Sequence, residues 1–238
     1  LRFFSVPDTH FRIDETGNMV IPYKFHEPLR FNQYGLAVGD GATHHGIFDV
    51  SFISHIPGMT LLAPSSYNSL CDMLSFAERH SGPVAIRYPR GGDRGELTSG
   101  WNGEKTSVCH RHGADFTIVT HGTLVYNALA AAELLAQQGV EVTVIRLLDV
   151  SQLDDATVSC EMLENRHVLI MEEVSTGSGI REAVAWKIHQ HRQDALIYGI
   201  DLGHNFVTHG DVSSLYKPYG LDSQSVCNYI LEVVRNEN

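Results

Sequence analysis

The alternation of short apolar runs with longer amphipathic ones, from residue 59 onward, constrains the fold of this chain most strongly. Within 65–80, for example, Leu70, Met73 and Ala77 recur at helical spacing. We expect strands over 59–64, 83–88, 116–120, 140–147, 167–171 and 195–200, and helices over 65–80, 126–138, 154–164, 179–191 and 223–235. Strands and helices that alternate at this pace predict an α/β fold with parallel or mostly parallel sheets, covered on both faces.

One segment interrupts this alternation and divides the chain into two α/β domains. Residues 93–114 are rich in Gly, Ser, Thr and charged side chains, as linkers are. The linker would join a partial domain at 36–92 to a second domain at 115–238, and 238 residues suffice for two compact domains. Residues 1–35 show no convincing periodicity, and we interpret them as a segment between domains.

The acidic balance of the chain limits its partners. The net charge is −11, from 28 acidic and 17 basic side chains. Nucleic acids and anionic lipid surfaces attract basic faces, so we expect neither as a partner. No apolar run is long enough for a transmembrane helix. The 4 cysteines lie far apart, which indicates free thiols and a reducing, cytoplasmic location.

The segment 39–46, Gly-Asp-Gly-Ala-Thr-His-His-Gly, is the first candidate site. Its glycines suit a loop that bends sharply or approaches a ligand closely. His44 could transfer protons near neutral pH, and Asp40 could orient a hydroxyl group or an imidazole. A simple turn is the alternative interpretation. His44, His45 and Asp49 lack the spacing of zinc ligands, so we expect no protein-bound transition metal.

The second candidate site is the run Arg-Tyr-Pro-Arg-Gly-Gly at 87–92. It follows a predicted strand, and ligands of open parallel α/β sheets bind at the carboxyl ends of the strands. Arginine can hold a phosphate through two parallel hydrogen bonds, although two surface arginines in a loop would have the same sequence. The glycine-rich helix start at 176–179 could bind an anion, but simple capping is the favoured interpretation. Glu172 and Glu173 are interpreted as polar strand-end residues.

Four motifs, taken in their order along the chain, resemble one family. They are D-G-x-T-H-H-G-x-F-D at 40–49, I-P-G-M at 56–59, A-P-S at 63–65 and P-V-A-I-R-Y-P-R-G at 83–91. This series resembles the pyrimidine-binding domain of 1-deoxy-D-xylulose-5-phosphate synthase, a transketolase-type thiamine-diphosphate enzyme. Later segments are similar to the third domain of that family. The resemblance covers roughly residues 36–235.

The resemblance implies a reaction and roles for four residues. Enzymes of this type join pyruvate, after loss of carbon dioxide, to D-glyceraldehyde 3-phosphate, using thiamine diphosphate and Mg²⁺. By position, His44 matches a catalytic residue that acts on the substrate oxygens. Asp40 matches an acidic residue near the acceptor substrate. Arg90, with Tyr88 beside it, matches the group that holds the aldehyde's phosphate. A cytoplasmic homodimer is also implied.

The resemblance is incomplete on the amino-terminal side. Residues 1–35 contain neither a recognisable cofactor-activating glutamate nor the diphosphate domain that binds Mg²⁺, and Gln33 stands where a second phosphate arginine is expected. We therefore expect the cofactor ligands upstream of Leu36. One hypothesis is that sequence is missing between about residues 22 and 35, which an intact-mass measurement tests.

Three interpretations of function stay open at this point. The synthase is the first, and the R-Y-P-R-G run at 87–91 favours it. Another transketolase-like enzyme with a different acceptor, or the E1 β subunit of a 2-oxo-acid dehydrogenase, is the second. The third is a non-catalytic transketolase-like module for binding or assembly, which the missing glutamate supports.

Overall fold

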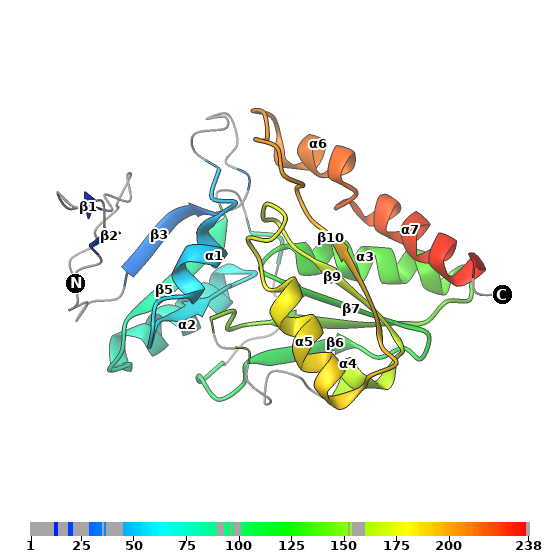
Figure 1. Cartoon of the computed structure of the whole chain (residues 1–238), viewed down its shortest axis with the longest axis horizontal. Coiled ribbons are helices and arrows are strands. Elements are labelled where there is room, and N and C mark those ends of the chain that lie inside the picture. Colours follow the sequence, from blue (N-terminus) through cyan, green and yellow to red (C-terminus); the bar gives the residue numbers. More distant parts are fainter. Residues whose placement is uncertain are drawn as a thin grey trace.

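The computed structural model of this chain describes residues 12–13, 19–20, 29–34, 36, 45–89, 93–95, 97, 101–151, 153 and 160–236, the first three ranges as backbone only. Two sheets dominate it (Figure 1). A three-stranded sheet has the order β3-β5-β4, and a five-stranded sheet has the order β10-β9-β7-β8-β6. Every pair in them is parallel except β6 with β8, which confirms the predicted α/β class. The short strands β1 (Arg12–Ile13) and β2 (Met19–Val20) pair antiparallel.

The smaller sheet consists of β3 (Leu29–Tyr34), β4 (Thr60–Leu62) and β5 (Val84–Pro89), with α1 (Asp49–Ser54) and α2 (Tyr67–Arg79). Helix α2 begins where the sequence predicted, because Ser66 and Ser69 cap each other's backbone N–H groups. The apolar stripe of α2 buries Met73 and Ala77. Neither β3 nor α1 was predicted from the sequence.

The larger sheet contains β6 (Ser107–Arg111), β7 (Phe116–His121), β8 (Val142–Leu147), β9 (His167–Met171) and β10 (Leu196–Ile200). Its helices are α3 (Leu124–Ala136), α4 (Cys160–Glu164), α5 (Arg181–His191), α6 (Val212–Tyr216) with the 3-10 turn η1 (Lys217–Tyr219), and α7 (Ser223–Asn236). The left-handed φ of +77° at Gly139 lets the chain turn after α3, as predicted.

One sequence prediction is wrong in this region. The expected linker over 93–114 contains β6, which pairs antiparallel with β8 at the edge of the larger sheet. Every residue of β6 is only partly buried, and the pairing has a bulge at His110. An edge strand of this kind carries no continuous apolar run, so its sequence resembles a loop.

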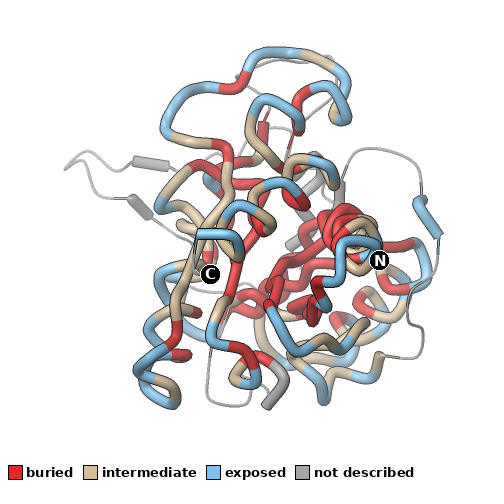
Figure 2. Tube along the Cα trace, turned by 90° about the vertical axis from the view of Figure 1, so that its right-hand side faces the viewer, coloured by how far each residue is buried: buried red, intermediate tan, exposed pale blue. Residues whose placement is uncertain are grey.

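Two apolar layers cover the faces of the larger sheet. Ile118 and Val144 face α3 and α7, whereas their neighbours Val119 and Ile145 face α4 and α5. The second layer continues into the smaller sheet through residues such as Leu61, so the two sheets share a core. Figure 2 shows this buried interior as the red part of the trace. Burying each such aliphatic side chain stabilises the fold by about 1.5–3 kcal/mol.

The carboxyl ends of strands from both sheets meet. Ala63 N–H donates to Leu148 O at 2.9 Å, and Val150 N–H donates to Leu61 O at 2.8 Å. Leu62 and Asp149 form an antiparallel bridge between these two bonds. The end of β4 is thereby fixed against the segment that follows β8. Ligands of parallel α/β sheets bind at this edge, so polar side chains near it are candidates for a functional site.

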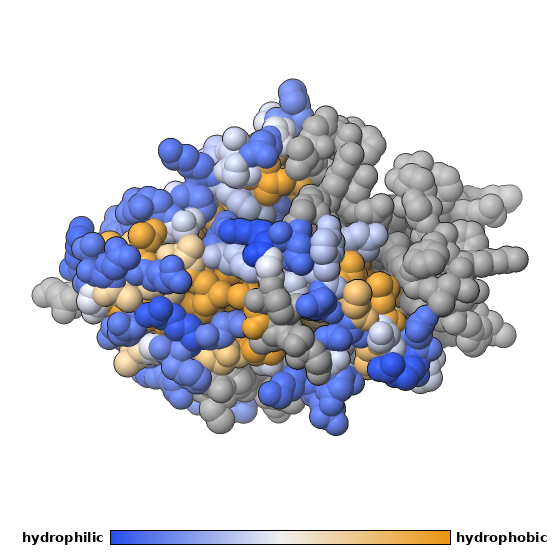
Figure 3. Space-filling view, turned by 180° about the vertical axis from the view of Figure 1, so that it is seen from behind, coloured by the Kyte–Doolittle hydropathy of each residue, from blue (hydrophilic) through white to orange (hydrophobic). Residues whose placement is uncertain are grey.

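The molecular surface mixes polar and apolar side chains. From behind, apolar patches lie between larger polar areas on the part of the surface that the structure describes (Figure 3). Among the residues that the structure describes, no helix has both the length and the apolar content needed to span a membrane.

Candidate functional site

The structure places the sequence-predicted site residues unequally. Asp40, His44 and Arg90 lie outside the described residues, and of Gln33 only the backbone in β3 is described. Tyr88 is half-buried near the end of β5. The described residues on either side of these positions therefore define the surroundings of the candidate site.

A buried ion pair joins β5 to the start of α1. Arg87 Nε donates to Asp49 Oδ2 at 2.8 Å, and the two side chains are only 6% and 2% exposed. Arg87 Nη2 also donates to Glu173 O at 3.0 Å and lies 3.5 Å from Gly46 O. Burial raises the pKa of Asp49, while the Arg87 guanidinium opposes that rise. The interpretation of Arg87 as a surface or phosphate-binding arginine is wrong, because its guanidinium is engaged inside the protein.

Glu173, the second residue after β9, accepts hydrogen bonds at both carboxylate oxygens. Leu36 N–H donates to Oε1 at 2.6 Å, and Tyr216 Oη–H donates to Oε2 at 3.0 Å. Burial raises the pKa of Glu173, against the lowering effects of Arg87 and of the Leu36 hydrogen bond. The Tyr216 pKa is raised by burial first and by the neighbouring Glu173 second. Each oxygen of this carboxylate thus accepts a hydrogen bond from the chain itself.

Glu172 caps helix α5. Its Oε1 accepts from Ile180 N–H at 2.7 Å, and its Oε2 accepts from Arg181 N–H at 3.1 Å. A Cβ at Gly179 would lie 2.2 Å from Oε1, so glycine is needed for this close approach. The glycine-rich helix start is therefore capped by the chain's own carboxylate, as the favoured interpretation predicted, rather than left open to an external anion.

His121, the last residue of β7, lies in a buried polar cluster with Asp49, Arg87, Glu172 and Glu173. Its Nε2 lies 3.4 Å from Glu172 Oε1, and the residue is only 2% exposed. Within the described part of the chain, His121 Nδ1 and Asp49 Oδ1 have no hydrogen-bond partner. Sequence reasoning missed this cluster, although one signal was present: Glu172, Glu173 and His121 each stand at or just after the end of an apolar strand.

The segment that follows His44 is packed against loops of the larger sheet. His45 is buried, and its Nε2 lies 3.2 Å from Thr208 O. Ser175 N–H donates to Ile47 O at 2.9 Å. The Phe48 and Phe206 rings meet edge to face, with their centroids 6.3 Å apart. Residues 45–48 are consequently held by the loops after β9 and β10.

The described residues do not fit the Mg²⁺ site that the family resemblance implies. Within the described ranges, no group of three or more His, Cys, Asp or Glu side chains could hold a metal ion. The buried carboxylates already have partners: Arg87 for Asp49, and backbone N–H groups for Glu172 and Glu173.

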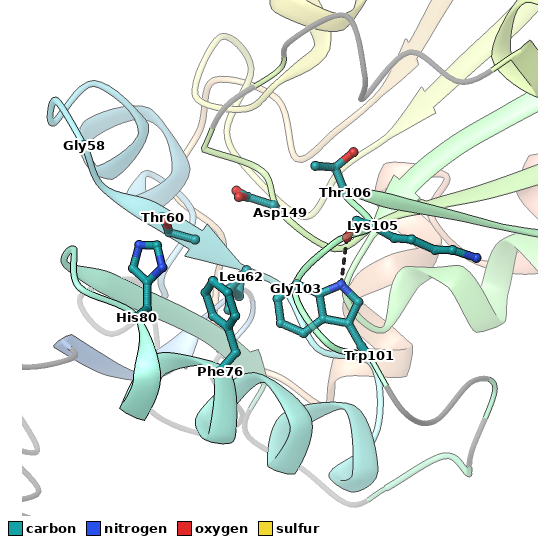
Figure 4. Close-up of a pocket in the computed structure, with 10 residues that line it drawn as sticks. All are labelled: Gly58, Thr60, Leu62, Phe76, His80, Trp101, Gly103, Lys105, Thr106 and Asp149. Carbon is teal, nitrogen blue, oxygen red and sulfur yellow. Dashed lines mark hydrogen bonds between the residues drawn. The ribbon is translucent and has the colours of Figure 1, made fainter.

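A separate cavity of about 240 Å³ lies beside β4, where Thr60, Leu62 and Asp149 are among the residues that line it (Figure 4). Phe76 lines it, with its ring centroid 4.9 Å from that of His80 and 5.1 Å from that of Trp101. The sticks in Figure 4 show Asp149 across the space from these rings. Tyr88, in contrast, lies towards the carboxyl end of β5. Tyr88 is not among the described residues that line this cavity.

We expect His110 to make the stability of the fold depend on pH. Burial, and secondly the nearby Arg146 guanidinium, lower its pKa from 6.5 to about 4. The His110 ring therefore binds a proton less tightly in the folded state than in the unfolded state. The free energy of unfolding is then highest above pH 6.5 and decreases as the pH falls towards about 4. We expect the melting temperature of His110→Gln to fall less than that of the wild type over this window. Replacing exposed His204 is the control, and equal pH slopes for His110→Gln and wild type would contradict the assignment.

Comparison with known proteins gives two matches to family models. Residues 105–226 match the transketolase C-terminal domain, and residues 33–93 match the transketolase pyrimidine-binding domain. The chain is 37% identical over 202 residues to a 1-deoxy-D-xylulose-5-phosphate synthase of Chlorobium phaeovibrioides, covering 82% of this chain and 32% of that protein. It is 32% identical over 229 residues to the synthase of Chlorobium luteolum, covering 94% and 36%. The chain thus spans about a third of the length of these relatives.

Solved structures share the fold. A split-gene transketolase, described as an inactive β4 tetramer, aligns with a TM-score of 0.72 at 23% identity, over 85% of this chain and 65% of that one. A transketolase mutant from Pichia stipitis aligns with a TM-score of 0.67 at 20% identity, over 88% of this chain and 30% of that one. With the two matched domains and the parallel sheets of the structure, these likenesses lead to one conclusion: the chain belongs to the transketolase family and contains its pyrimidine-binding and C-terminal domains.

Proposed function

We propose that this chain is part of a thiamine-diphosphate-dependent transferase. The reaction joins pyruvate, with loss of carbon dioxide, to D-glyceraldehyde 3-phosphate and forms 1-deoxy-D-xylulose 5-phosphate. The observation that carries the proposal is the 37% identity over 202 residues with a synthase of that name. The R-Y-P-R-G run at 87–91, which favoured this synthase over other transketolase-type enzymes, supports it further.

We assign roles to four residues within this proposal. His44 is the proton carrier for the substrate oxygens, and Asp40 orients the acceptor. Arg90 holds the phosphate of the aldehyde, and Tyr88 lines the same site. The contact of Arg87 with Asp49 and Gly46 supports a shared site, because His44 is two residues before Gly46 and Arg90 is three residues after Arg87.

The cofactor and the assembly are part of the same proposal. The reaction needs thiamine diphosphate, which supplies the carbanion chemistry, and Mg²⁺. Ligands for either group are proposed upstream of Leu36, and a cytoplasmic homodimer is proposed as the working form. The test uses the protein expressed from its whole open reading frame, with both cofactors, pyruvate and the phosphorylated aldehyde. We expect carbon dioxide release that depends on the aldehyde, and its absence would overturn the proposal.

Arg90→Ala is expected to lower kcat/KM for D-glyceraldehyde 3-phosphate by roughly 10- to 100-fold, chiefly through KM. A charge-assisted hydrogen bond is worth about 1.5–3 kcal/mol, and each 1.4 kcal/mol is a factor of ten. Steady-state kinetics with D-glyceraldehyde, which lacks the phosphate, should show a much smaller change. Arg79→Ala, at the exposed end of α2, is the matched control. Equal losses for both aldehydes would show that Arg90 does not read the phosphate.

A further inference from the structure

The C-terminal domain holds the chain just before the segment that carries His44. Leu36 is 2% exposed, and its N–H donates to Glu173 Oε1 at 2.6 Å, across 137 residues of sequence. Glu173 itself is 6% exposed. A buried carboxylate costs several kcal/mol of desolvation unless hydrogen bonds compensate for it, and an apolar residue would avoid that cost. A carboxylate here therefore points to a directional contact rather than to stability alone.

Glu173 also holds the chain just after the segment that carries His44. Arg87 Nη2 donates to Glu173 O at 3.0 Å, while Arg87 Nε binds Asp49, four residues after His45. Next to Glu173 along the chain, Ser175 N–H donates to Ile47 O at 2.9 Å. One short stretch after β9 thus reaches both flanks of residues 37–44.

Two donors fix the Glu173 carboxylate in one orientation. Leu36 N–H occupies Oε1, and Tyr216 Oη–H, from α6, occupies Oε2 at 3.0 Å. Both oxygens are buried and accept hydrogen bonds from the protein, so the carboxylate is placed to hold Leu36 and Tyr216 rather than to contact a substrate. Its burial and its two protein donors separate it from a general acid or base, which must reach the reacting atoms.

We propose that Glu173, in the C-terminal domain, is a positioning residue. Its carboxylate holds Leu36 and its backbone carbonyl holds Arg87, and these two contacts set the position of the chain before and after His44. The proposal deepens the proposed function, since it takes His44 as the catalytic residue. It also gives the C-terminal domain, to which we assign no catalytic side chain, a direct role at the site.

Hydrogen exchange tests the contact without any assay of activity. In the full-length protein, Glu173→Ala should speed exchange of the Leu36 amide by about tenfold or more, the factor expected for one lost hydrogen bond. Glu173→Gln keeps an acceptor and should stay within about threefold of wild type. Amides of α3 should be unchanged in both variants. Glu182→Ala, an exposed acid in the first turn of α5, is the control.

Kinetics then test the link to His44. If the wild type has the proposed activity, Glu173→Ala should lower kcat by about tenfold or more with little change in KM for the aldehyde, and Glu173→Gln should restore most of the loss. A general loss of folding would instead expose α3 in the exchange data. Should Glu173→Ala fail to fold, Tyr216→Phe replaces it, and Leu36 exchange faster than in wild type is then expected.

The outcomes separate the two proposals. Unchanged Leu36 exchange in Glu173→Ala, or in Tyr216→Phe where that variant replaces it, overturns the positioning role whatever the activity. Faster Leu36 exchange with unchanged kcat in an active enzyme overturns it as well. A wild type without synthase activity overturns the proposed function, and the exchange data alone then support or overturn the positioning of the chain by Glu173.

Discussion

Arg87→Met is expected to lower the free energy of unfolding by about 3–5 kcal/mol, the usual cost of removing one partner of a buried ion pair. The Asp49 carboxylate, now 2% exposed, would lose the guanidinium that lies 2.8 Å away. Glu173 O would lose a donor as well. Most of this loss in stability comes from leaving the Asp49 carboxylate buried without its ion-pair partner, and less comes from the lost hydrogen bond itself.

Denaturant titration of the variant measures this loss, and a double-mutant cycle identifies its origin. Arg87→Met combined with Asp49→Leu should recover most of the stability, because well-packed apolar residues can replace a buried ion pair at little cost. The control is Arg111→Met, which removes a half-exposed pair with Glu141 and should cost at most about 1 kcal/mol. If Arg87→Met costs no more than this control, the pair does not act as a buried unit.

His44→Ala is expected to lower kcat of the proposed synthase reaction by about 10²-fold or more, the usual contribution of a general acid or base. Imidazole is the side chain whose ordinary pKa allows it to give and take protons near neutral pH. Alanine leaves no group to replace it. Measured kcat and KM separate this effect from substrate binding, since the loss of a proton carrier should appear mainly in kcat.

The adjacent histidine is the natural control for this experiment. His45 is buried against Thr208 O, so His45→Ala should alter thermal stability more than turnover. His44→Asn keeps hydrogen-bonding capacity but no titratable ring, and we expect it to be nearly as slow as His44→Ala. Equal kcat losses for His44→Ala and His45→Ala would show that local folding, and not proton transfer, explains the effect.

Most strands that the sequence predicted well are buried on both faces, although β10 was predicted and is only partly buried. All six residues of β7 and all six of β8 are buried, so their sequences are almost continuous β-prone runs. Strand β6 was missed because it is a half-buried edge strand with a bulge at His110. Strand β3, Leu-Arg-Phe-Asn-Gln-Tyr, mixes polar with apolar residues, and its parallel pairing with β5 is a tertiary contact.

By itself, the sequence determined the α/β class, the family, and the segments at 39–46 and 87–92 as candidate sites. The spacing of apolar residues and the order of the motifs can both be taken directly from the linear sequence, without knowledge of tertiary contacts. Only the tertiary structure decided that Arg87 pairs with Asp49 and that Glu173 binds Leu36, contacts that span 38 and 137 residues. Such partners are set by which strand ends the parallel sheets bring together, and no local pattern encodes that meeting.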